Sequence, residues 1–173
     1  QDFWTGMPEI LSQFQEVLWA ETPLRADHQF ALSDDGIGRV WGRDVEERPW
    51  VGSPDIIGIA GNKLTLADLK TSVKPYCRWW PKNLEKGSQE WRDRLGGYMK
   101  FNKCMLQLGA YALGIEQTLD MKVQQAAIIV STPGTTQLFK ITRPHLNKFQ
   151  DKWLKVVDEY YNDPDHIVPL MMD

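Results

Sequence analysis

Cysteine is scarce in this chain of 173 residues, which contains only Cys77 and Cys104. Two cysteines cannot build a disulfide framework, a four-cysteine zinc site or an iron–sulfur cluster within one chain. The sequence also has no apolar run near the roughly 18 residues that a membrane-spanning helix needs. We therefore expect a protein of a reducing compartment, with no membrane partner and no iron–sulfur cluster.

An initiator methionine and a signal-like start are missing as well, since the chain begins QDFWTGMPEI. We expect from this start that a segment preceding residue 1 has been removed. Hydrophobic residues make up 42% of the chain and charged residues 25%. This composition and length predict a single globular domain over residues 1–173.

Charge is distributed unevenly, although the net charge of −3 at first disfavours a nucleic-acid partner. Residues 70–103 contain nine Lys or Arg and three acids, with aromatic residues between them. Cations for phosphates and rings for bases are typical of proteins that hold single strands. A solvated loop whose tryptophans pack on the core would give the same pattern. The candidate DNA contacts are Lys74, Arg78, Trp79, Trp80, Lys100 and Lys103.

Apolar spacing predicts the order helix, strands, helix, hairpin, helix. That order is typical of an α/β or α+β domain, with a mixed central sheet flanked by helices. Residues 70–97 show no clean period and predict a long connection, which in a compact domain is usually functional or disordered. The predicted elements are a helix over 7–21, strand pairs over 26–45 and 54–71, a helix over 99–119, a hairpin over 123–142 and a helix over 142–161.

The stretch SPDIIGIAGNKLTLADLKTS, residues 53–72, sets two carboxylates in apolar strands. Asp68 and Lys70 are two apart in a strand and so project to one face, and a hairpin brings Asp55 to the same end. Such a cluster is costly unless something binds it. Mg²⁺ prefers these oxygen ligands and supports phosphodiester hydrolysis. The alternative is an exposed ion pair at a strand end, which contributes little.

Gln107 and Tyr111 are four residues apart on the predicted helix over 99–119, so they share one face. They border its apolar stripe and are placed to reach the sheet edge where the carboxylates lie. The alternative is an ordinary helix rim, with the ring of Tyr111 against the core and its hydroxyl in water.

Taken together, Asp55, Asp68-Leu69-Lys70 and Gln107-x-x-x-Tyr111 resemble the PD-(D/E)XK nuclease superfamily in its RecB-like branch. The longer strings DLKTSVKP, LQLGAYALGI and QAAIIVSTPGTTQLFKIT are similar to the mitochondrial genome maintenance exonuclease family and its bacterial and phage relatives. The resemblance covers roughly residues 16 to 161. Because some RecB-like nucleases hold a four-cysteine cluster, two cysteines favour the cluster-free branch.

The resemblance implies a restriction-endonuclease-like core and a Mg²⁺-dependent DNA exonuclease, with Mn²⁺ as a substitute, that prefers single strands or free ends. By the same carry-over Asp55, Asp68 and the main-chain carbonyl of Leu69 bind metal. Lys70 is the catalytic lysine, and Gln107 and Tyr111 support the site. A bacterial or phage-infected cytoplasm is the expected location, or the mitochondrial matrix of a eukaryote.

Two features of the family are less well matched. Glu21 falls where relatives often have a further metal-binding acid, but Glu46 and Glu47 compete for that role, and all three also suit solvated surface. Relatives usually carry a histidine on an upstream helix. None of the three histidines in this chain lies in such a setting: His28, His145 and His166.

The acid–lysine motif leaves two alternatives to the exonuclease. An endonuclease of the same superfamily uses the same residues. A non-catalytic DNA-binding or scaffolding module would use Asp55 and Asp68 as structural ion-pair partners.

Overall fold

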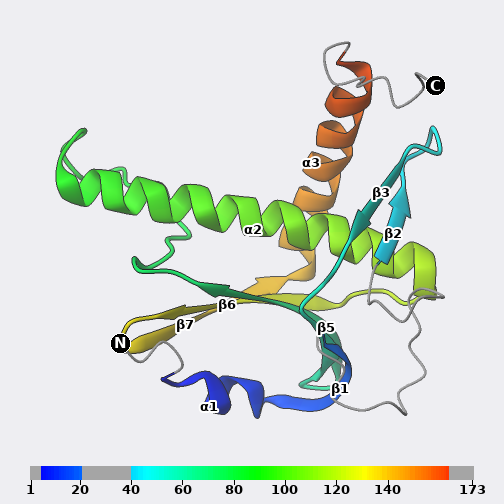
Figure 1. Ribbon diagram of the computed structural model, residues 1–173, viewed down its shortest axis with the longest axis horizontal. Helices are drawn as coiled ribbons and strands as arrows, with labels where there is room; N and C mark the ends of the chain where they lie inside the picture. Colours follow the sequence, from blue (N-terminus) through cyan, green and yellow to red (C-terminus); the bar gives the residue numbers. More distant parts are fainter. Residues whose placement is uncertain (1–4, 21–39, 164–173) are drawn as a thin grey trace, which may run out of the picture.

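The computed structural model describes residues 5–20 and 40–163. Its elements begin with a short helix and end with a long one (Figure 1). In chain order they are α1 (Met7–Leu11), β1 (Phe14–Ala20), β2 (Val40–Arg43), β3 (Pro49–Gly52), β4 (Ile56–Ala60), β5 (Lys63–Thr71), α2 (Gln89–Leu119), β6 (Gln125–Thr132), β7 (Thr135–Thr142) and α3 (Arg143–Asn162).

Five strands form a mixed sheet in the order β1-β4-β5-β6-β7. Only β5 and β6 are parallel, and α2 makes the crossover that parallel neighbours require. Figure 1 shows α2 and α3 over one face of this sheet and α1 over the other. The β2–β3 hairpin forms a separate two-stranded sheet beside the C-terminal half of α2. The expected α+β class, with a mixed sheet flanked by helices, is confirmed.

Alternation along β5 divides its side chains between two apolar clusters. Leu64 and Leu66 join the larger cluster beneath α2. Ala67 and Leu69 belong to the smaller cluster beneath α1. The strand is therefore buried on both faces, and any polar residue within it needs a partner.

The two long helices cross closely at Gly109. A Cβ atom at Gly109 would lie 2.6 Å from the backbone carbon and oxygen of Phe149 on α3, so only glycine permits this approach. Nearby, Arg143 of α3 donates hydrogen bonds to Glu116 of α2 and, at 2.7 Å, to the Val123 carbonyl oxygen. These contacts fix α3 against α2 and the start of β6.

The predicted helix over 7–21 is wrong beyond Leu11, because Phe14–Ala20 forms β1 and pairs with β4. Register shifts between Phe14 and Glu16, and between Val17 and Trp19, interrupt the strand. An extra residue in a strand reverses its alternation. Phe14 and Val17 therefore both pack toward the α1 side, three residues apart, which imitates helical spacing.

The helix predicted to start at Met99 begins ten residues earlier, at Gln89. The Ser88 side chain accepts a hydrogen bond from the Trp91 N–H at 3.1 Å and caps it. Gly97 lies inside this helix. Glycine is needed there because a Cβ atom would come within 2.6 Å of the Pro75 carbonyl oxygen. The connection after β5 thus passes directly beneath α2 and covers only residues 72–88.

The remaining predicted elements have mixed outcomes. The strand pair over 54–71, the hairpin over 123–142 and the final helix are confirmed. Thr142 occupies the cap position of α3, but its side chain makes no capping hydrogen bond. The turn expected within 26–45 lies outside the described residues, and β2 pairs with β3 instead. No helix in the described ranges is long and apolar enough to cross a membrane.

Replacing Gly109 with alanine should destabilise the protein. The added methyl group meets the Phe149 backbone, and relieving such overpacking costs about 1–3 kcal/mol. Thermal unfolding should show Tm lowered by roughly 2–4 °C for each kcal/mol. Gly96→Ala is the control on the same helix, because a Cβ there meets nothing within 4 Å. It should leave Tm unchanged or higher. Equal Tm values for both variants would contradict the close crossing.

Candidate metal-binding and catalytic site

The site lies where β5 extends past the end of β4. The last paired residues are Ala67 of β5 and Ile56 of β4, so residues 68–71 have a strand partner only in β6. Asp55 immediately precedes β4, and its Oδ2 accepts a hydrogen bond from the Leu69 N–H at 2.6 Å. The Asp55 carboxylate thus accepts the hydrogen bond that a backbone carbonyl of β4 would accept if the strand continued.

The main-chain carbonyl of Leu69 projects to the same edge as its N–H, because both groups of a strand residue point to one side. It therefore lies on the Asp55 side, beyond the end of β4. The Leu69 side chain packs with the α1-side cluster. The use of the Leu69 carbonyl as a metal ligand stays a prediction.

Asp68 and Lys70 project together toward α2, as their spacing predicts. The Lys70 Nζ lies 2.8 Å from the Asp68 Oδ1. Asp68 is only 1% exposed, whereas Lys70 is half-buried. The second oxygen of Asp68, Oδ2, is buried and makes no hydrogen bond in the described part of the chain, although the Cys104 thiol lies close enough to the carboxylate to lower its pKa weakly. A buried carboxylate oxygen without a hydrogen bond lowers the stability of the fold, so this position is suited to a bound group.

Burial governs the ionisation of this pair. Desolvation raises the pKa of Asp68 to about 6, although the hydrogen bond and charge of Lys70 act in the opposite direction. Burial alone would lower the pKa of Lys70, but its hydrogen bond and ion pair with Asp68 outweigh that effect and raise it. Lys70 is therefore a cation at neutral pH, and Asp68 loses its proton near pH 6.

Two further side chains surround Asp68 and were missed by sequence reasoning. Burial, and then the charge of Asp68, raises the pKa of the Cys104 thiol to about 12. Burial, and then Cys104, raises the pKa of the Tyr76 hydroxyl to about 12. Both groups therefore stay neutral beside the carboxylate. The only sequence signal is that Cys104 lies about one turn before Gln107 on the same helix.

A second cation approaches the end of β5 from α2. The Lys100 Nζ donates to the Ser72 Oγ at 3.2 Å and lies 5.8 Å from the centre of the Tyr76 ring. Tyr76 is held in turn by Gln137 of β7, which accepts from its N–H at 2.8 Å and donates to its carbonyl at 3.1 Å. Lys100 thus lies at the site, where a phosphate contact was expected.

Tyr111 reaches the chain segment that carries Asp55. A Cβ added to Gly52, the last residue of β3, would overlap the Tyr111 ring, so the ring lies against the Gly52 backbone. Gly52 is three residues before Asp55. Gln107 lies one turn earlier on the same flank of α2 and is half-buried. Its role at the site stays a prediction.

The other candidate DNA contacts divide between the two flanks of α2. With about 100° per residue, Lys100, Gln107 and Tyr111 share one flank, and Tyr98 and Asn102 lie on the other. Lys74 forms an ion pair with Asp93 on the Lys100 flank. Lys103 is exposed on the outer surface of α2.

Arg78, Trp79 and Trp80 are not brought to the carboxylates. Arg78 donates to the Lys140 carbonyl oxygen of β7 at 2.6 Å. The Trp80 ring packs edge-to-face on Tyr98, with centroids 5.6 Å apart. All three residues therefore lie on the flank of α2 away from Lys100.

Of the less certain acids and the histidines, the described ones, Glu46, Glu47 and His145, do not join the site. Glu21, His28 and His166 lie outside the described residues. Glu46 and Glu47 form ion pairs in the turn after β2, at 3.4 Å with Arg48 and 2.9 Å with Arg43. His145 packs edge-to-face on Phe149 of α3, with centroids 5.8 Å apart.

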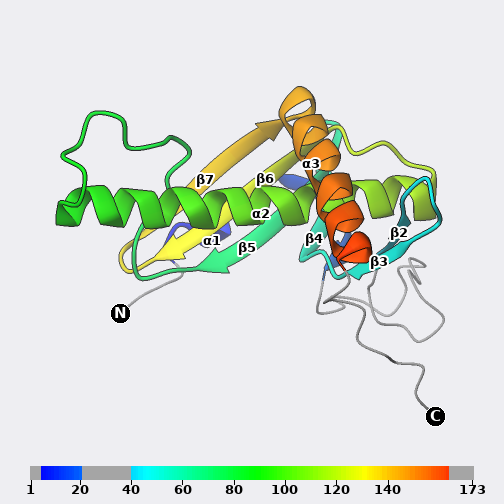
Figure 2. The same ribbon diagram turned by 90° about the horizontal axis from the view of Figure 1, so that it is seen from above.

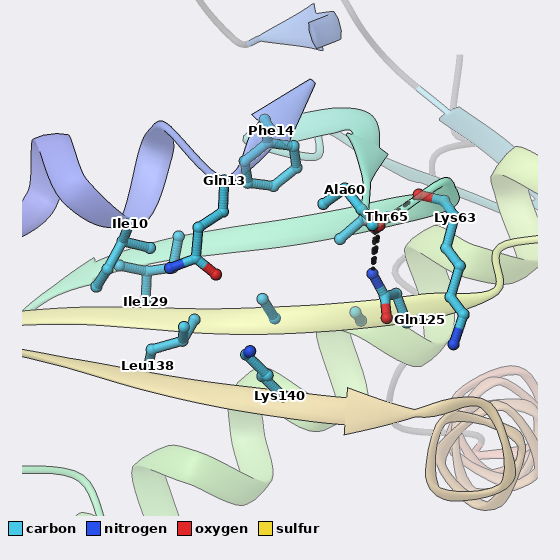
Figure 3. Close-up of a pocket in the computed structure, with 13 residues that line it drawn as sticks. Ile10, Gln13, Phe14, Ala60, Lys63, Thr65, Gln125, Ile129, Leu138 and Lys140 are labelled. Carbon is cyan, nitrogen blue, oxygen red and sulfur yellow. Dashed lines mark hydrogen bonds between the residues drawn. The ribbon is translucent and has the colours of Figure 1, made fainter. Parts of the chain in front are cut away.

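The α1 face of the sheet has a pocket of its own, of about 310 Å³ (Figure 3). The Gln125 Nε2 donates there to the Thr65 Oγ1 at 2.8 Å and to the Ala60 carbonyl oxygen at 2.9 Å. No acid within residues 5–20 and 40–163 lines this pocket, and the side of β5 that carries Thr65 is opposite the side that carries Asp68. It is therefore separate from the carboxylate site.

The donors that a metal would find are Asp55, the free Oδ2 of Asp68 and the Leu69 carbonyl. Within residues 5–20 and 40–163, no three His, Cys, Asp or Glu side chains gather to hold an ion. A set of few oxygen donors suits Mg²⁺, which keeps several waters and leaves positions for a phosphate. The unpartnered Oδ2 of Asp68 fits such an ion.

Comparison with known proteins assigns no family. No family model matches the chain, and no curated protein matches it. Among solved structures, the crystal structure of SSO0001 aligns over 88% of this chain, with 12% identity and a TM-score of 0.41. The alignment spans 56% of the SSO0001 chain. A likeness at this level carries no argument, so any function has to be argued from the residues of the site.

Mn²⁺ affinity should depend on pH through Asp68. A protonated carboxyl is a poor ligand, and the pKa of Asp68 without metal is about 6. Affinity should therefore be constant above pH 7 and fall by about tenfold per unit below pH 6. Isothermal calorimetry between pH 5 and 8 measures it. The Asp68→Asn variant should bind Mn²⁺ weakly at every pH. If it binds Mn²⁺ as tightly as the wild type, Asp68 is not a metal ligand.

Proposed function

We propose that this protein is a metal-dependent DNA exonuclease of the RecB-like branch, acting on single strands or free ends. The observation that supports it is the buried, unpartnered Oδ2 of Asp68, held between Asp55 and Lys70 where β5 outruns β4. The mixed sheet with α2 as crossover is compatible with a restriction-endonuclease-like core. The proposed location is a bacterial or phage-infected cytoplasm, or the mitochondrial matrix.

In this proposal Asp55, Asp68 and the Leu69 carbonyl hold Mg²⁺ or Mn²⁺. The ion, when bound, lowers the pKa of a coordinated water and neutralises charge on the scissile phosphate. Lys70 orients the attacking water or stabilises the negative charge that develops on the phosphate. It can do so at neutral pH because the ion pair keeps it protonated.

The neighbouring groups favour an anionic substrate. Tyr76 and Cys104 stay neutral and add no negative charge beside Asp68. Lys100 adds a second cation at the end of β5, where it can contact a phosphate next to the one that is cleaved. Tyr111 supports the Asp55 segment through Gly52.

Cleavage should require a free end and an intact Asp68. With Mg²⁺, wild type should degrade a linear labelled single strand and leave a circular strand of similar sequence intact. Asp68→Asn should slow this by about 10³-fold, because it removes a ligand of an ion that contributes several kcal/mol. Gel electrophoresis of both substrates, with and without chelator, measures it. Asp151→Asn, an exposed acid on α3, is the matched control.

Two outcomes would change the proposal. Cleavage of the circle would identify an endonuclease that uses the same site. Cleavage that persists in Asp68→Asn, or absence of cleavage by the wild type, would favour the non-catalytic DNA-binding module.

Lys70→Met should lower kcat by about 10²–10³-fold and leave DNA affinity nearly unchanged. A group that acts mainly on charge developing in the transition state contributes to the rate more than to binding. Single-turnover kinetics, together with binding in chelator, separates the two effects. Lys122→Met, an exposed lysine beyond the far end of α2, is the control. Loss of affinity alone would make Lys70 a phosphate anchor.

A further inference from the structure

A groove lies on the flank of α2 opposite the carboxylates. Its volume is about 530 Å³, and its walls come from residues 78–83, from α2 and from the first turns of α3. Figure 2 shows the connection between β5 and α2 passing to the side of α2 where β7 and α3 lie. The groove is thus built by three segments that are distant in sequence.

Its charge is of one sign. Among the described residues, four cations line it and no acid does: Arg78, Lys82, Lys148 and Lys152. None of these four appears in an ion pair with a carboxylate in the part of the molecule that the structure describes. Three of these cations also affect His145, which lines the groove. Burial, and then the charges of Arg78, Lys148 and Lys152, lower the pKa of His145. Such a groove attracts an anion with several charges.

Two of its aromatic residues, Trp79 and Trp80, are exposed, and Trp80 is held in place. The side chain of Trp79 is 73% exposed and that of Trp80 is 47% exposed. Trp80 is fixed by edge contacts to Trp91 and Tyr98, with centroids 6.5 Å and 5.6 Å apart. Large exposed rings beside unpaired cations are the combination that binds single strands, since bases stack on rings while phosphates meet cations.

We propose that this groove is a second nucleic-acid site, which holds a single-stranded segment by its phosphates on Lys82, Lys148 and Lys152 and by a base on Trp79. Its ligand class rests on the proposed nuclease function. Because α2 and the core beneath it lie between the groove and Asp68, the bound segment is not the one under attack. It is a more distant part of the same substrate, or its partner strand.

An acidic protein segment would also meet the four cations. It would leave Trp79 uncovered, since a carboxylate-rich chain offers no flat ring to stack on an indole. The exposed indole therefore favours a nucleic acid, and the two partners differ in their need for bases.

The test is anisotropy of a labelled oligothymidylate of about 12 nucleotides, measured in chelator so that binding is separate from cleavage. Lys148→Ala/Lys152→Ala should reduce the salt slope of log K by about 1.4, because each phosphate that a lysine neutralises contributes roughly 0.7 to the slope. Trp79→Ala should weaken binding about five- to a hundredfold. Lys122→Ala, at an exposed lysine that does not line the groove, should bind as wild type.

The competing outcomes are distinct. Unchanged affinity and salt slope in the lysine and tryptophan variants would overturn the groove as a nucleic-acid site, and so would the absence of any oligonucleotide binding. Metal-dependent cleavage would support the nuclease function independently of either result. An abasic oligomer that binds as tightly as oligothymidylate would also overturn it, because any polyanion would then suffice. If these variants lose oligonucleotide binding but the wild type does not cleave DNA, the groove remains a nucleic-acid site and the proposed nuclease function is wrong.

Discussion

Much of this molecule depends on keeping Asp68 ionisable inside the core. The carboxylate is almost fully buried beneath α2, and only one of its oxygens is held, by Lys70. Such a group is tolerated because it lies near the end of β5, past the last residue paired with β4. Because β4 ends before Leu69, the Leu69 N–H is free to donate its hydrogen bond to the Asp55 carboxylate. One truncated strand thus produces the whole cluster of oxygens.

The position of α2 follows from the same cluster. The helix closes the sheet over Asp68, and its inner surface presents Cys104, which stays neutral, rather than another charge. Gly97 and Gly109 let the helix come close to the β5 connection and to α3. Asp68 is buried beneath this helix, and its burial is what raises its pKa. The ionisation of the site is therefore set by helix packing as much as by neighbouring charges.

Sequence reasoning identified the parts of the site that follow from short-range rules. Alternation in a strand placed Asp68 with Lys70, and a hairpin placed Asp55 nearby. It failed where tertiary contacts override local pattern: the bulges in β1 imitated a helix, and residues 89–97, expected in the connection after β5, belong to α2. Tyr76 could not be predicted at Asp68, because only the path of the connection beneath α2 brings it there. The same path separates Arg78, Trp79 and Trp80 from the carboxylates.

That path has a mechanical consequence. Residues 75–77 lie directly against Gly97, so this part of the connection cannot swing outward as a lid unless α2 lifts from the sheet. Lifting it would expose Phe101, Met105 and Leu108, at about 1.5–3 kcal/mol for each side chain. Tyr76 is consequently held on one flank of α2, and the chain reaches the other flank by Trp79, three residues later. In the proposed function, this short stretch of chain acts as a spacer between the strand segment at the carboxylates and the segment in the groove.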